Sequence, residues 1–170
     1  MNYVHLIQYM NDSLKKFIFK TLLIFTFIIL NSCAVNNKMM IGSEVAEIAL
    51  PLSFESQKRK IQKNPNNQLF YLNASKSRIT YAYGILMEKG DRLMYTNYYK
   101  SRNYYSKSLD LFVISRNYLL NALEVKYENF TQRMKNREEI VFEKEDIDYL
   151  YWLSGSLAGC IQASQGDPQY

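Results

Sequence analysis

Few side chains in this 170-residue sequence are of types that do covalent or metal chemistry. They are one histidine, His5, two cysteines, Cys33 and Cys160, and a run of acids, Glu143, Glu145, Asp146 and Asp148. Clustered carboxylates can hold a metal ion, but acids that gather at the start of a predicted helix also complement its dipole and stay solvated. We interpret the run in this second way, and we expect no metal site, no cofactor and no catalytic residue.

Cys33 closes a segment that has the three parts of an export signal. Lys15, Lys16 and Lys20 form a basic region, an apolar run covers residues 21–30, and Asn31 and Ser32 precede the cysteine. An uninterrupted run of about 10 residues is roughly half of what spans a bilayer, which disfavours the alternative of a short transmembrane anchor. A start at Met10 would give a signal of more ordinary length than a start at Met1, and both remain open.

The tetrad Leu30-Asn31-Ser32-Cys33 resembles the bacterial lipobox, although Asn31 departs from the small residue usual at its position. The resemblance implies that residues 1–32 are a lipoprotein signal peptide that is removed, and that Cys33 then carries the lipid. Several acyl chains on one cysteine make a durable membrane anchor. The chain is therefore expected on the periplasmic side of a bacterial membrane, inner or outer. With Cys33 lipidated, Cys160 has no partner for an intramolecular disulfide.

Removal of the signal changes what the composition implies. The formal net charge of +5 falls to about +3, because the signal contains three lysines and one aspartate. A balance this mild does not indicate nucleic-acid binding. His5 also leaves with the signal, which excludes nucleophile triads built on histidine and most zinc sites. No nucleotide or metal motif appears, so an enzyme is the class that the sequence favours least.

The rest of the chain predicts helices and no sheet. Expected helices cover about 41–62, 67–89, 101–127 and 146–163, following a polar tether over 33–40. Asn66 or Asn67 is expected to cap the second helix and Gly90 to end it. We therefore divide the chain into the signal, the tether and one helical repeat domain over residues 41–170.

Apolar residues recur at helical spacing, which predicts the faces that pack. The expected faces are Leu69, Leu72, Ile79, Tyr83 and Leu86 in the second helix, Leu109, Phe112, Val113, Leu119, Leu120, Leu123 and Tyr127 in the third, and Ile147, Leu150, Tyr151, Ser154, Leu157, Ala158 and Ile161 in the last. The last helix is also rich in small residues, which predicts close helix packing. Arg116 shares the apolar face of the third helix. Whether its side chain extends to solvent or ties helices together is open.

Amphipathic helices of about 20 residues, separated by Asn-Pro or Gly-Asp turns, have the cadence of helix–turn–helix repeat proteins. Three segments resemble the T-component family of TRAP transporters. The first begins at the Asn64-Pro65 turn and runs through residues 69–88, and the second is LFVISRNYLLNAL, in which Phe112, Ser115 and Asn117 replace that family's Tyr, Ala and Asp. The third is DIDYLYWLSGSLAGCIQASQGDP. The resemblance covers roughly residues 45–168.

The resemblance implies an all-α fold of tetratricopeptide-like stacked helical hairpins, an α-solenoid. It also implies a non-catalytic periplasmic lipoprotein that forms oligomers, binds the substrate-binding protein of a TRAP transporter and assists import of small organic ligands. Family members continue with further helix pairs, so we expect a solenoid truncated at its C-terminus. The alternative function is a generic tetratricopeptide-like envelope lipoprotein that acts as a protein-interaction scaffold.

Tyrosines are concentrated between Met94 and Lys107. The candidate partner-binding residues are Tyr95, Tyr98, Tyr99, Tyr104 and Tyr105. Tyrosine suits protein interfaces because its ring buries area while its hydroxyl keeps a polar contact. AT-rich codon usage would also enrich tyrosine, and the sequence leaves both explanations open.

Overall fold

Helices connected by turns and loops make up residues 44–167, the part of the chain that this computed structural model describes, and these residues contain no strand. The predicted signal peptide, Cys33 and the tether lie outside the described residues. The residues from Val45 onward form one compact unit. Among the described residues, no helix combines the length and the hydropathy that a membrane span needs.

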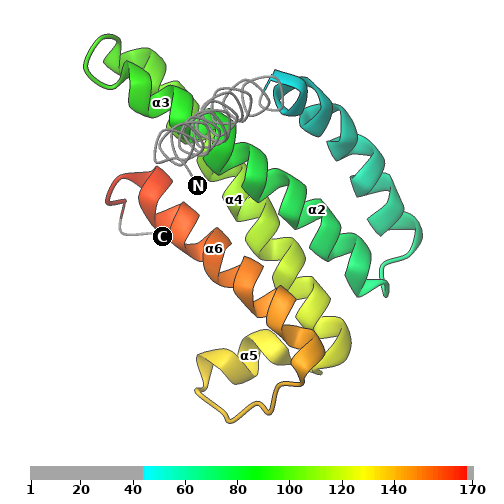
Figure 1. Cartoon of the computed structure of the whole chain (residues 1–170). Coiled ribbons are helices and arrows are strands. Elements are labelled where there is room, and N and C mark those ends of the chain that lie inside the picture. Colours follow the sequence, from blue (N-terminus) through cyan, green and yellow to red (C-terminus); the bar gives the residue numbers. More distant parts are fainter. Residues whose placement is uncertain (1–43, 168–170) are drawn as a thin grey trace, which may run out of the picture. The chain divides into compact units, whose positions relative to one another are not determined.

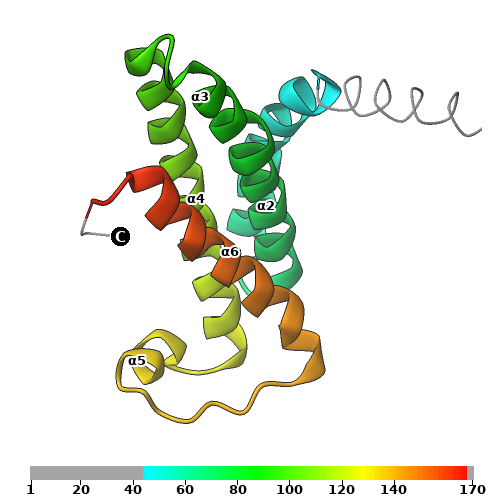
Figure 2. The same cartoon turned by 60° about the vertical axis from the view of Figure 1, so that its left-hand side comes forward.

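The long helical stretches, residues 44–63, 68–93, 98–126 and 147–164, run in alternating directions, so that neighbours along the chain pack as antiparallel hairpins (Figures 1 and 2). After a helix over residues 44–63 come α2 (Gln68–Tyr81), η1 (Ala82–Met87), α3 (Glu88–Leu93), α4 (Tyr98–Lys126), α5 (Phe130–Lys135), η2 (Lys144–Asp146) and α6 (Ile147–Ser164). The long α4 contacts both α2 and α6. The prediction of an all-α fold of helical hairpins is confirmed.

Asparagines begin two of these helices. The Asn67 side chain accepts a hydrogen bond from the backbone N–H of Leu69 at 3.1 Å, as the sequence predicted for Asn66 or Asn67. The Asn97 side chain does the same for the N–H of Lys100 at 3.0 Å. Each side chain thereby satisfies a donor that the first turn of a helix leaves unpaired.

Gly90 does not end the second helix, and that prediction was wrong. Helical structure continues from α2 through a π-helical turn, η1, and on through α3 to Leu93. Gly90 lies within α3, where a Cβ atom would stand 3.0 Å from the ring of Tyr105. The glycine permits close approach of α3 and α4, and the Ser101 hydroxyl donates to its carbonyl at 2.7 Å. Tertiary packing, rather than a helix cap, explains the glycine.

The core is centred on α4, whose Phe112, Leu119 and Leu123 are fully buried, as predicted. At Gly159 of α6 an added Cβ would lie 2.5 Å from the Phe112 ring, so the helices approach as closely as a missing side chain allows. The prediction of close packing through small residues is confirmed at this contact. The buried face of α6 consists of Leu153, Ser156, Gly159, Cys160, Ala163 and Ser164.

The predicted packing face of the last helix was wrong. Ile147, Tyr151, Leu157 and Ile161 are exposed. At Gly159 the ring of Phe112 leaves no room for a side chain, so the face of α6 that packs on α4 is formed by small residues together with Leu153. Ile147, Tyr151, Leu157 and Ile161 therefore face outward. Leu69, which was expected on the buried face of α2, is also exposed, whereas Tyr71 and Leu72 are buried there.

Candidate functional site

The five candidate tyrosines do not form one surface. Tyr95 and Tyr99 are 95% and 87% exposed, and with Tyr98 they surround the turn between α3 and α4. Tyr104 is half-buried and lines a cavity on another side of α4.

Tyr105 belongs to the core, where it is 5% exposed. Its hydroxyl donates to the Asp91 carboxylate, and burial together with this hydrogen bond raises the pKa of Tyr105 to about 12. It therefore stays protonated at physiological pH and stabilises the α3–α4 contact.

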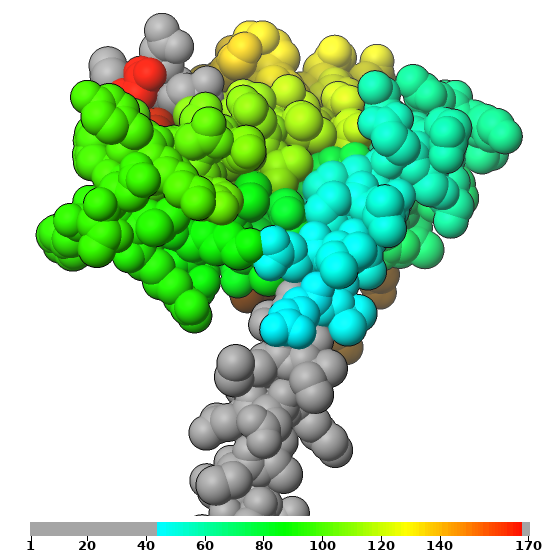
Figure 3. Space-filling model, turned by 90° about the horizontal axis from the view of Figure 1, so that it is seen from above, coloured from blue at the N-terminus to red at the C-terminus, as the bar shows by residue number. Residues whose placement is uncertain are grey.

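A groove runs between the helix over residues 44–63 and α4, with α2 at its base. It contains two neighbouring cavities of about 370 Å³ each, which share Phe54 and Leu111 in their lining. Figure 3 shows the helix over residues 44–63, in cyan, at the surface beside the following helices. A larger and shallower hollow of about 670 Å³ surrounds the turn at residues 63–69, but polar turn residues form most of its lining. We take the groove as the candidate site because it combines apolar, aromatic and charged groups.

One cavity of the groove is lined mainly by apolar and aromatic side chains, with charges around them. Its lining is Glu47, Pro51, Phe54, Tyr81, Leu86, Lys89, Tyr104, Lys107, Asp110 and Leu111. Lys89 and Glu47 form an ion pair that links α3 to the helix over residues 44–63. The hydrogen bond with Glu47 raises the pKa of Lys89, and burial raises the pKa of Tyr81.

The other cavity contains a buried cation. Its lining is Phe54, Glu55, Lys58, Arg78, Leu111, Ile114, Asn117 and Tyr118. Arg78 is 4% exposed, and burial lowers the pKa of its guanidinium. The guanidinium carbon lies 4.5 Å from the centre of the Phe54 ring and 5.3 Å from that of Tyr118. Rings at these distances stabilise a cation through their π faces.

Neutral oxygens complete the surroundings of Arg78. The guanidinium donates to the Gln57 side chain at 2.8 Å, to the Ala74 carbonyl at 3.0 Å and to the Phe54 carbonyl at 3.0 Å. Within residues 44–167 no carboxylate lies at ion-pair distance from it. Arg78 therefore ties the first hairpin together and places a positive charge beside the cavity, whose lining also includes Glu55.

The sequence analysis left two roles open for Arg116, extension to solvent or a tie between helices. The structure does not give it the tying role that Arg78 has. It is half-exposed, and its Nε lies 3.4 Å from the side chain of Asn117. This favours a side chain that extends to solvent. Sequence reasoning missed Arg78. In the structure it shares the buried face of its helix with Ser75, three residues before it, and Ala82, four residues after it.

Comparison with protein families agrees with the helical hairpins described above. The model of the TRAP transporter T-component family matches residues 43–170. The chain belongs to this family. A comparison with curated proteins found no match. As a T-component, the chain is an accessory protein of TRAP transport and is associated with a TRAP transporter.

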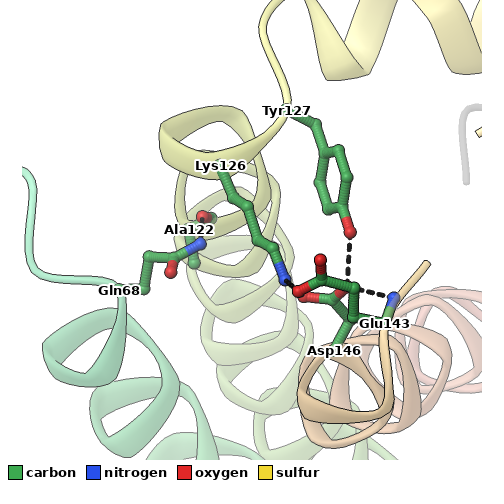
Figure 4. Close-up of polar contacts among 6 residues, drawn as sticks. All are labelled: Gln68, Ala122, Lys126, Tyr127, Glu143 and Asp146. Atoms are coloured by element: carbon green, nitrogen blue, oxygen red, sulfur yellow. Dashed lines mark hydrogen bonds and ion pairs between the residues drawn. The ribbon is translucent and has the colours of Figure 1, made fainter. Parts of the chain in front are cut away.

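Three of the acids between Glu143 and Asp148 form ion pairs, Glu143 and Asp146 with Lys126 and Asp148 with Lys76. Asp146, 2% exposed, accepts hydrogen bonds from Lys126 Nζ at 2.8 Å, from the Tyr127 hydroxyl and from the backbone N–H of Glu143 at 2.8 Å (Figure 4). Burial alone would raise the pKa of Asp146, but these hydrogen bonds outweigh it and hold the pKa below its ordinary value. The network attaches the start of α6 to the end of α4. Among residues 44–167 no group of three or more His, Cys, Asp or Glu side chains is placed to hold a metal ion.

Proposed function

We propose that this T-component is a non-catalytic periplasmic lipoprotein that binds the substrate-binding protein of its TRAP transporter and assists import of small organic ligands. Family membership supports the transport role. The observation that carries the binding role is the groove between the helix over residues 44–63 and α4, which offers recesses without an arrangement of catalytic groups.

The groove has the chemistry of a protein-binding surface. Its cavities of about 370 Å³ have aromatic and aliphatic walls, which suits them to the large side chains that anchor an interface. At one end Arg78 and Lys58 outnumber the single acid in the lining, Glu55, so an acidic side chain of the partner fits there. Because Arg78 is already held by three hydrogen bonds, little side-chain freedom would be lost when the partner binds.

The proposed lipid on Cys33 fits the same role. An anchor confines the chain to a thin layer beside the membrane, where the transporter also lies. Confinement raises the effective concentration of two partners without any new contact. A modest affinity between the T-component and the binding protein is then enough for assembly, and it still permits release.

The test is binding of the purified mature chain to the substrate-binding protein of its TRAP transporter, measured by calorimetry. Ile114→Arg places a charge in the groove, and we expect it to weaken binding at least about tenfold, since loss of a central apolar contact costs more than 1 kcal/mol. The matched control is Val125→Arg, because both residues are partly exposed on α4 but Val125 lines neither cavity.

Two outcomes would count against the proposal. Equal weakening by both variants would move the contact away from the groove. No association at micromolar concentrations, for this chain and for another family member, would remove the transport-partner role and favour the generic scaffold.

A further inference from the structure

The outward face of the helix over residues 44–63 begins with an apolar stripe. Val45, Ile48 and Leu52 are 60%, 68% and 75% exposed. Their spacing of three and four residues places them on one side of the helix. The other side packs on α2, where Ile61 is buried and the Gln57 side chain donates to the Ser77 hydroxyl at 2.9 Å. The stripe is therefore not part of the core of the described unit.

The same face continues with positive charge. Arg59 and Lys63 follow Leu52 at helical spacing, and Lys58 and Lys60 flank them, all four exposed. None of the four takes part in an ion pair among the described residues, and Glu55 is the one acid between Leu52 and Lys63. Apolar side chains in one half and basic side chains in the other match the tails and headgroups of an anionic lipid surface.

The position of this helix in the chain limits its distance from a membrane. Ten residues, 34–43, separate it from Cys33. Even fully extended they span at most about 35 Å, at roughly 3.5 Å per residue. This step rests on the proposed lipid anchor. Given that anchor, the outward face of this helix is always within reach of the bilayer.

We propose that Val45, Ile48, Leu52, Arg59 and Lys63, which we call the outer face, dock onto an anionic phospholipid surface. The acyl chains supply most of the affinity, and the outer face adds a second contact that fixes how the domain sits on the membrane. Membrane binding that combines an acyl chain with a basic patch is stronger than either alone. The basic contribution is electrostatic, so it weakens as salt screens the charges.

The test uses the mature chain with Cys33→Ser, so that binding does not depend on acylation. Sedimentation is compared for vesicles of phosphatidylcholine alone and for vesicles that also contain phosphatidylglycerol. We expect binding only to the anionic vesicles, with at least about a tenfold loss for Ile48→Ser with Leu52→Ser and for Arg59→Glu with Lys63→Glu. The matched control, Leu157→Ser with Ile161→Ser, removes two exposed apolar residues from α6 and should change binding less than about twofold.

Failure to bind anionic vesicles, or an equal loss in the α6 control, would overturn the proposal. Sedimentation velocity on the same variants tests the other occupant. A dimer that dissociates with Ile48→Ser and Leu52→Ser, together with unchanged vesicle binding, would assign the outer face to a second copy of the chain. The vesicle assay contains neither lipid on Cys33 nor the substrate-binding protein. A negative result in this assay therefore leaves the proposed function standing. Conversely, if lipidation or binding of the substrate-binding protein is not found, the vesicle assay can still be interpreted.

Discussion

At the scale of single residues, the buried Arg78 links two helices through several contacts of its guanidinium group. It joins two helices through carbonyl oxygens and one amide, between two aromatic rings. Arg78→Met should lower the free energy of unfolding by about 2 kcal/mol or more, since hydrogen bonds to a charged group contribute roughly 1.5–3 kcal/mol. Urea denaturation measures the change. Arg78→Lys should recover only part of it, because an ammonium lacks the planar fork of donors.

Arg116→Met is the matched control for Arg78. Its side chain is half-exposed and makes one long contact, so the substitution should change stability by less than about 0.5 kcal/mol. Equal effects of the two substitutions would show that Arg78 contributes no more than an ordinary surface arginine.

Asp146 makes the stability of the folded protein depend on pH in the acidic range. Its folded pKa lies below the ordinary value of 3.8, so its stabilising contribution is complete above that pH and is lost as pH falls towards the lowered pKa. Asp146→Asn should reduce stability at neutral pH and flatten the loss of stability below about pH 4. Thermal unfolding across that range measures both effects.

Asp148→Asn is the control for Asp146. The Asp148 side chain is 62% exposed, and its ion pair with Lys76 lies at the surface. Exposed ion pairs contribute about 0–1 kcal/mol, so this variant should follow the acid profile of the unsubstituted chain. A profile for Asp146→Asn that also follows it would contradict the role given to the network.

At the scale of elements, the contact between α4 and α6 depends on one missing side chain. Gly159→Ala would place a Cβ 2.5 Å from the Phe112 ring, so it should destabilise the domain by about 1–3 kcal/mol. Gly155→Ala, four residues earlier in the same helix, meets nothing within 4 Å and should be neutral or stabilising by up to about 1 kcal/mol.

Chemical denaturation of the two glycine variants measures the difference. Phe112→Leu should reduce the cost of Gly159→Ala, since a smaller neighbour makes room for the methyl group. A Gly159→Ala chain as stable as Gly155→Ala would show that α4 and α6 can separate without cost.

At the scale of the whole molecule, the outer face and the groove share the helix over residues 44–63, and the proposed lipid anchor, Cys33, precedes that helix in the sequence. One side of that helix carries the outer face, and another forms a wall of the groove. The three proposals are nevertheless separable, because each has variants that leave the other two intact.

Lipidation is the prediction that decides how the whole molecule is held. Labelled palmitate should enter the protein in cells, and Cys33→Ala should abolish the label and release the protein from the membrane fraction. Cys160→Ala is the control, because that thiol is buried and burial raises its pKa, which leaves it unreactive. Equal labelling of the Cys33→Ala chain would remove the lipid anchor and its contribution to local concentration.

The sequence by itself predicted the all-α class, a cap at Asn66 or Asn67, the burial of Phe112, Leu119 and Leu123, and the family, because helical periodicity, capping chemistry and motif order are local properties of the chain. Only the tertiary structure decided which face of α6 packs, why Gly90 and Gly159 are glycines, and that Arg78 rather than Arg116 is buried. These features depend on which side chains meet across helices. Phe112, for example, excludes bulk from α6 at a separation of 47 residues. The hydrophobic pattern of α6 shows how apolar each of its faces is. Which face packs on α4 depends on the space beside the Phe112 ring, which the sequence of α6 does not show.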